Sequence, residues 1–144
     1  MYGVADRRSC GVALDGRFGQ AYNEEAFRYF LRIERKRAAR AQRPVLVLLL
    51  DLREPSARMR IEPALAARLF DCLWRCLRET DVVGWYREDR VAGAVLTQVD
   101  AAVPPEVTDV IRRRVGTALR EGFSADVARH LRVRVIQLRP GPKG

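Results

Sequence analysis

The run Val45-Leu46-Val47-Leu48-Leu49-Leu50, which ends at Asp51, decides the fold of this chain. Six consecutive aliphatic residues are expected of a central strand that is covered on both faces, and Pro44 stops any helix just before it. On the N-terminal side, Asn23 is followed by two glutamates and by apolar residues at helical spacing, which predicts an N-capped helix that runs to about Arg40.

Four more elements are predicted on the C-terminal side of this strand. Pro55 and Ser56 mark a loop, after which apolar residues at three- and four-residue spacing predict a helix over 61–79. Strand-like stretches at Val82–Tyr86 and Val91–Thr97 flank a short polar loop and predict a hairpin. A third helix is expected after Pro105, with Val110 among the residues of its apolar stripe. The last strand over Leu131–Leu138 alternates apolar residues with arginines, as an edge strand does. Apart from the first helix, the order is the α+β, ferredoxin-like βαββαβ arrangement.

This topology places two carboxylates at one end of the sheet. The first strand ends beside the tip of the predicted hairpin, so Asp51 and Asp89 are expected to be neighbours. Two such carboxylates could hold a divalent cation such as magnesium. Carboxylates at strand ends are also common as solvated loop residues, and this second interpretation is the one that we favour.

Composition bounds the class of protein. The 144 residues suit one compact domain, and a formal charge of +9 predicts attraction to anions. No apolar stretch approaches the roughly 20 residues of a membrane helix, and residues 1–21 lack the apolar core of a secretory signal, so we expect a cytoplasmic protein with no membrane span. Three cysteines and one histidine give neither a disulfide framework nor a four-ligand zinc site. We expect residues 1–21 to be a flexible arm and 139–144 a tail.

Three stretches carry a resemblance to a known family. They are Tyr22–Phe27, Val45–Leu52 and above all Arg78–Tyr86, which reads RETDVVGWY. Together they make residues 22–138 resemble the GGDEF domain of diguanylate cyclases, which make cyclic di-GMP from two GTP molecules with magnesium. The resemblance implies the nucleotidyl-cyclase-like form of the ferredoxin-like fold, with an additional N-terminal helix. It also places Asp51 and Asp89 at the metal-binding positions of the family.

The sequence departs from the family at both of its motifs. The signature Gly-Gly-Asp/Glu-Glu-Phe is replaced by Arg87-Glu88-Asp89-Arg90-Val91, so that only the third position keeps its acid. Glycine lets a backbone turn approach phosphate closely, and two long side chains obstruct that approach. Met59 and Arg60 stand where the family has the Asn and Asp that read guanine. We therefore expect a degenerate GGDEF domain that has no cyclase activity and no required cofactor, with weak or no affinity for magnesium.

One further family feature is present at the right spacing. Active cyclases often carry an inhibitory Arg-x-x-Asp site for their product, and here Arg78 and Asp81 match it. An arginine can donate two hydrogen bonds to the O6 and N7 edge of guanine, while a carboxylate accepts from its N–H groups. The plain structural interpretation is that Arg78 lies at the C-terminal end of a helix and Asp81 stabilises a turn. Both interpretations stay open.

Two functions from different classes follow. The first is an inactive regulatory domain that binds cyclic di-GMP through Arg78 and Asp81, in bacterial signalling or in the control of polysaccharide synthesis. The second is a pseudoenzyme that serves as a protein-interaction or homodimerisation module without a nucleotide ligand, for which Trp74, Trp85 or the basic first helix could form the contact. Nucleic-acid binding is not favoured, because the predicted strands lack the aromatic pairs that stack on bases.

Overall fold

A computed structural model describes residues 12–13, 20–54, 57–78, 81–96 and 105–139. Its main element is an antiparallel sheet in which β3 (Val45–Glu54) lies inside. On one side β3 pairs with β6 (Val91–Leu96) and on the other with β7 (Leu131–Leu138), and β5 (Val82–Arg87) pairs with β6. The spatial order β7-β3-β6-β5 confirms the predicted ferredoxin-like topology, with β7 at an edge.

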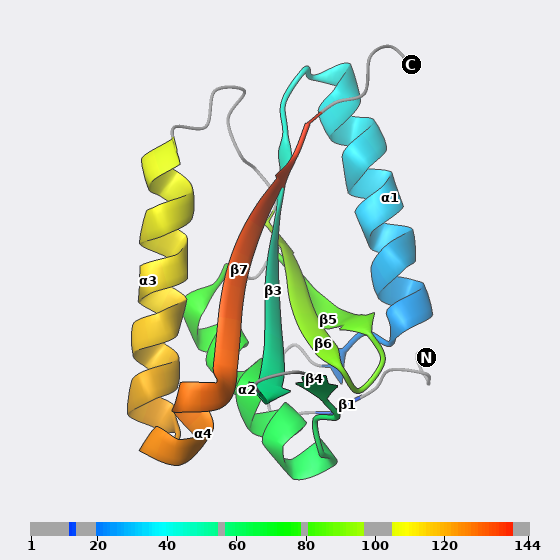
Figure 1. Ribbon diagram of the computed structural model, residues 1–144. Coiled ribbons are helices and arrows are strands. Elements are labelled where there is room, and N and C mark those ends of the chain that lie inside the picture. Colours follow the sequence, from blue (N-terminus) through cyan, green and yellow to red (C-terminus); the bar gives the residue numbers. More distant parts are fainter. Residues whose placement is uncertain (1–11, 14–19, 55–56, 79–80, 97–104, 140–144) are drawn as a thin grey trace.

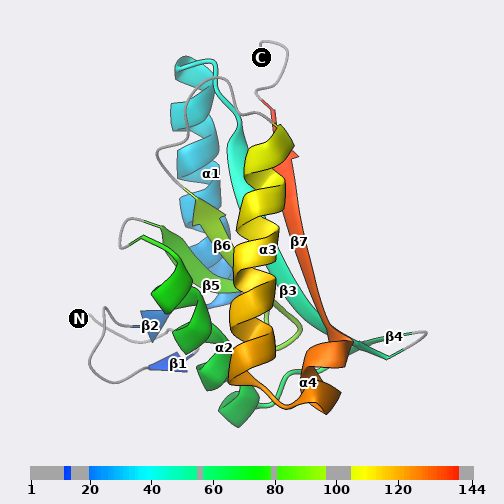
Figure 2. The same cartoon turned by 90° about the vertical axis from the view of Figure 1, so that its left-hand side faces the viewer.

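Helices cover both faces of this sheet (Figures 1 and 2). Helix α1 (Glu24–Arg40) lies on one face, and α2 (Pro63–Cys76) and α3 (Pro105–Gly122) lie on the other. Side chains of β3 alternate between the two layers: Leu46, Leu48 and Leu50 pack in the α2–α3 layer, whereas Val47 and Leu49 pack in the α1 layer. All five are at most 3% exposed, as expected of a strand that is covered on both faces.

The predicted start of α1 is confirmed in detail. The Asn23 side chain accepts a hydrogen bond from the Ala26 N–H at 2.9 Å, and two glutamates occupy the first turn. Before it, Tyr22 runs against the outer edge of β5, where its N–H donates to the Val83 carbonyl and its carbonyl accepts from the Trp85 N–H. A Cβ on Gly84 would lie 2.5 Å from the Tyr22 carbonyl oxygen, so this close contact requires glycine.

Several boundaries differ from the prediction. Strand β3 continues beyond Asp51 to Glu54, and β4 (Ala57–Met59) pairs with the last residues of β3, which gives a hairpin where a loop was predicted. Helix α2 ends at Cys76 rather than 79, because the chain turns extended at Leu77. A short helix, α4 (Ala125–His130), was not predicted; Ser124 caps it by accepting from the Val127 N–H.

The ends of the chain are described only in part. Within the predicted arm, β1 (Val12–Ala13) and β2 (Gln20–Ala21) form a two-stranded antiparallel sheet. Residues 1–11 and 14–19 of that arm, and residues 140–144 of the predicted tail, lie outside the described residues. In the described part of the chain, no helix is long and apolar enough to cross a membrane.

Two predictions, one of an exposed residue and one of a buried residue, are corrected by the structure. Trp85 was a candidate contact for a partner, but it is 1% exposed and its ring packs edge-on against Phe70 at 5.1 Å. Val110 was expected on the buried stripe of the third helix and is instead 45% exposed. Cys72 and Cys76 are free and half-buried; burial, together with the neighbouring Cys76, raises the pKa of the Cys72 thiol to about 11, which leaves it unreactive at neutral pH.

Candidate functional site

The hairpin between β5 and β6 is bound to the first turn of α1 by two carboxylates. Glu88 accepts a hydrogen bond from the Glu24 N–H at 2.9 Å, and Glu24 accepts one from the Glu88 N–H at 2.7 Å. Arg28 adds a hydrogen bond to the Tyr86 carbonyl and lies over the Tyr86 ring at 4.8 Å. The side chain that replaces the second glycine of the family signature is therefore held at a helix N-terminus, where a carboxylate is favoured.

The environment of Glu88 shifts its titration. Burial raises the pKa of the Glu88 carboxyl above its usual value, and the nearby carboxylates of Asp89 and Glu24 raise it further. The hydrogen bond that it accepts from the Glu24 N–H lowers the pKa, by less than burial raises it but by more than either neighbouring carboxylate does. This end of the hairpin thus gathers three carboxylates, two of which are paired with arginines: Glu24 with Arg28 and Asp89 with Arg60.

The opposite side of the hairpin tip is bound to the connection between β4 and α2. The Ile61 N–H donates to the Asp89 carbonyl at 2.7 Å, and the Arg60 guanidinium lies 3.4 Å from the Asp89 carboxylate. Asp89 itself has a φ of 61°, the left-handed conformation that glycine and short polar residues adopt in tight turns. The tip is consequently hydrogen-bonded to its own chain on two sides.

Asp51 lies at the same end of the sheet as Asp89 but faces arginines. In the sheet register it is opposite Val91, two residues after Asp89, and opposite Arg132 on β7. Its carboxylate is fully buried, 3.4 Å from the Arg132 guanidinium and 3.8 Å from that of Arg53. The structure therefore brings the two predicted acids to one end of the sheet, with a guanidinium beside each.

This donor set does not fit a magnesium ion. Magnesium is bound through carboxylates and waters, and it prefers carboxylates whose charge is not already balanced by a cation. Asp51 is beside Arg132 and Arg53, and Asp89 is beside Arg60. Among the residues that the structure describes, no group of three or more His, Cys, Asp or Glu side chains could hold a metal ion.

The predicted ligand-binding pair forms a compact turn between α2 and β5. The Asp81 carboxylate accepts from the Arg78 N–H at 2.9 Å, and the Asp81 N–H donates to the Arg78 carbonyl at 3.0 Å. Arg78 is exposed and Asp81 is half-buried. Asp81 thus stabilises the turn, as in the plain structural interpretation, and it also holds its carboxylate next to an exposed arginine. Since α2 ends at Cys76, Arg78 lies beyond the helix rather than in its last turn.

Two hollows lined by arginines were not identified from the sequence. One, of about 370 Å³, lies between α1 and the β3–β7 half of the sheet and is lined by Arg28, Arg32 and Arg35. The other, of about 680 Å³, lies between α3, α4 and β7. The spacing of three and four residues between the α1 arginines is a signal of one helix face. The second hollow depends on α4, which the sequence pattern did not predict.

Comparisons with known proteins agree with this architecture. No family model matches the sequence, and no curated protein matches it. Solved structures match the fold of this chain. The diguanylate cyclase SiaD of Pseudomonas aeruginosa, solved in complex with its activator SiaC, superposes with a TM-score of 0.63 at 17% identity over 85% of this chain. The GGDEF domain of TpbB, or YfiN, from the same organism gives a TM-score of 0.57 at 12% identity over 82% of this chain.

The class that these observations define is the α+β, nucleotidyl-cyclase-like fold, built on an antiparallel sheet of ferredoxin-like order. Within that class, the fold is that of GGDEF domains, and the resemblance inferred from the sequence is confirmed at the level of fold. The chain spans 49% of the SiaD chain and 70% of the TpbB chain.

Proposed function

We propose that this chain is a catalytically inactive GGDEF-like regulatory domain that binds cyclic di-GMP at Arg78 and Asp81. The observation that carries the proposal is that the polar groups of the hairpin tip already form hydrogen bonds and an ion pair within the chain itself. Glu88 is bound to the start of α1, and Asp89 is bound to the connection before α2.

Inactivity follows from electrostatics and space at that tip. A triphosphate that approached the hairpin would meet carboxylates whose arginine partners are already engaged: Glu24 is paired with Arg28 and Asp89 with Arg60, while Glu88 is bound to the Glu24 N–H. Bare backbone N–H groups, which cradle phosphates in nucleotide-binding turns, are replaced by a tip whose Glu88 N–H already donates to Glu24. Both features oppose the condensation of two GTP molecules.

The turn at Arg78 offers a different kind of surface. Arg78 is exposed, and the Asp81 carboxylate is bound to its backbone N–H, so the Arg78 side chain is not used by that hydrogen bond. An arginine and a carboxylate together match the donor and acceptor edges of guanine, and a carboxylate can accept from more than one donor. The chain carries a formal charge of +9, which favours a ligand with two phosphates. Because the turn lies away from the closed hairpin tip, ligand binding there does not require the reaction site.

Calorimetric titration with cyclic di-GMP tests the proposal. We expect binding by the unaltered chain, a loss of at least about tenfold in Arg78→Ala, and no change in Arg75→Ala. Arg75 is the matched control, because it is an exposed arginine on the last turn of α2, paired with Asp71. Absence of heat at high micromolar ligand would exclude binding at this site. Formation of cyclic di-GMP from GTP and magnesium would contradict the inactivity.

The second candidate, a protein-interaction or dimerisation module, is favoured by the surface between α1 and the sheet edge. There Ile136 is 36% exposed beside the arginines of α1. The structurally similar SiaD was solved in complex with a protein activator. A stable dimer in light scattering without ligand, together with no response to cyclic di-GMP, would favour this function over the first.

A further inference from the structure

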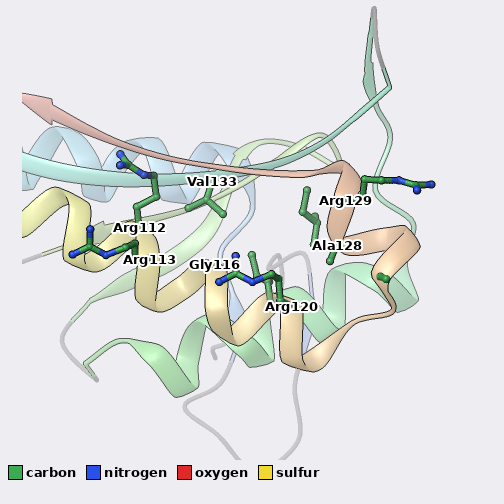
Figure 3. A pocket seen from close by; sticks show the side chains of 10 residues that line it. Arg112, Arg113, Gly116, Arg120, Ala128, Arg129 and Val133 are labelled. Atoms are coloured by element: carbon green, nitrogen blue, oxygen red, sulfur yellow. The ribbon is translucent and has the colours of Figure 1, made fainter.

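The proposed function does not use the hollow between α3, α4 and β7 (Figure 3). Its volume of about 680 Å³ lies in the range of sites for small organic ligands. Four arginines line it, three from α3 and one from α4: Arg112, Arg113, Arg120 and Arg129. No acidic residue is among those that line it.

The arginines differ in how their charge is balanced. Arg112 pairs with Asp109 and Arg129 with Asp126, each across one exposed helical turn. Arg120 donates to the Thr117 hydroxyl, which carries no charge. Arg113 forms no ion pair with any carboxylate in the described ranges. Because Arg112 and Arg129 are paired, the uncompensated charge among the four belongs to Arg113 and Arg120. In Figure 3 the Arg129 side chain also points away from the other three.

The floor of the hollow is apolar. Leu119, Leu131 and Val133 contribute aliphatic side chains from α3 and β7. Val133 faces this layer because alternate β7 residues pair with Leu48 and Leu50 of β3, whose side chains pack on the same side of the sheet. A ligand seated here would contact aliphatic groups below and guanidinium groups at the rim.

Gly116 also lines the hollow. It lies in the middle of α3, where glycine is a poor helix former, and no close contact explains it. A Cβ at this position would meet only the far end of Arg120, at 3.5 Å. Gly116 therefore leaves the α3 backbone beside the hollow without a side chain of its own, and the end of the Arg120 side chain lies next to it.

We propose that this hollow binds a nucleoside phosphate, with its phosphate on Arg113 and Arg120 and its base on the apolar floor. Arginine binds phosphate through two parallel hydrogen bonds, and its planar group also stacks on aromatic rings. A bare inorganic anion would use only the rim, and a neutral nucleoside only the floor, so the combination of both surfaces selects a molecule that has both parts. The site is separate from Arg78 and Asp81.

Titration of the full chain with ADP, adenosine and inorganic phosphate tests this proposal. We expect ADP to bind at least tenfold more tightly than either fragment, and the double variant Arg113→Ala/Arg120→Ala to weaken ADP binding at least tenfold. Arg114→Ala is the matched control, since Arg114 is exposed on the same helix but does not line the hollow. Equal weakening in this control, or no ADP binding at millimolar concentration, would overturn the proposal. So would phosphate alone binding as tightly as ADP.

A second variant keeps the test independent of charge. Gly116→Leu adds a helix-favouring side chain that fills the hollow, and its circular dichroism spectrum is expected to be unchanged while ADP binding is lost. Retained binding in a folded Gly116→Leu protein would also overturn the proposal. Because Arg78→Ala should leave ADP binding intact, failure at this site and failure at the cyclic di-GMP site are distinguishable.

Discussion

Arginines at the hairpin end of the sheet lie against carboxylates, whereas two arginines at the α3–α4 hollow face open surface. At the hairpin end, Arg132 and Arg53 accompany the buried Asp51, and Arg60 accompanies Asp89. At the hollow, Arg113 and Arg120 have no carboxylate partner among the described residues. Arginines that pair with carboxylates thus stabilise the hairpin end, whereas the arginines without such partners at the hollow can attract anions. The formal charge of +9 therefore does not by itself locate a binding site.

The two regions are expected to contribute to different properties, the hairpin end to stability and the hollow to ligand binding. Groups that the chain already pairs in a buried place contribute to folding, and their removal leaves a charge without its partner. Exposed groups that remain open contribute little to folding and can be removed at small cost. Substitutions at the hairpin end should therefore change the free energy of unfolding, and substitutions at the hollow should change ligand binding.

The largest effect is expected for Asp51→Ala. Breaking a fully buried ion pair costs about 3–5 kcal/mol, and water that reaches the partly exposed Arg53 and Arg132 reduces this to about 2–3 kcal/mol. Urea unfolding followed by circular dichroism measures the loss. The control is Asp126→Ala, whose pair with Arg129 is exposed and should be worth less than about 0.5 kcal/mol. Equal losses in the two variants would remove the distinction between the two regions.

Two glycines provide the next comparison, with effects of opposite sign. Gly84→Ala should lose about 1–3 kcal/mol, because its Cβ would lie 2.5 Å from a backbone oxygen of Tyr22. Gly116→Ala should gain about 0.5–1 kcal/mol, because the helix gains a better former and the nearest atom is 3.5 Å away. Thermal unfolding of both variants measures the signs. Destabilisation by Gly116→Ala would mean that the hollow is more tightly packed than its contacts indicate.

The sequence predicted the elements that have strong periodicity. The run Val45–Leu50 fixed the central strand, and Asn23 fixed the start of α1. The β3–β4 hairpin was missed because Pro55 and Ser56 were interpreted as a loop, and α4 was missed because six residues carry too little periodic signal. Short elements take their stability from tertiary contacts, which a single sequence does not display.

The candidate site was predictable in its residue types but not in its contacts. The loss of both signature glycines was visible at Arg87 and Glu88, and it was sufficient to predict an obstructed tip. The reciprocal bonds between Glu24 and Glu88 join residues 64 positions apart, and only the folded chain brings them together. The Arg132 partner of Asp51 likewise depends on the register between β7 and β3, which alternation of apolar residues does not determine across the sheet.

The smallest effect concerns the pH dependence contributed by Glu88. Because folding raises the pKa of this carboxyl above its ordinary value of 4.5, the folded chain holds the proton more tightly than the unfolded chain does. The unfolding free energy of the unaltered chain, minus that of Glu88→Gln, should therefore fall as the pH rises from about 4.5 through the folded pKa, and then become constant. Glutamine keeps an acceptor for the Glu24 N–H but does not titrate, and Glu106→Gln, exposed at the start of α3, controls for general charge effects. Urea unfolding in parallel at several pH values between 4 and 7 gives the difference. A difference that grew with pH would mean that the hydrogen bond from Glu24 outweighs burial, and that the tip stabilises the charged carboxylate after all.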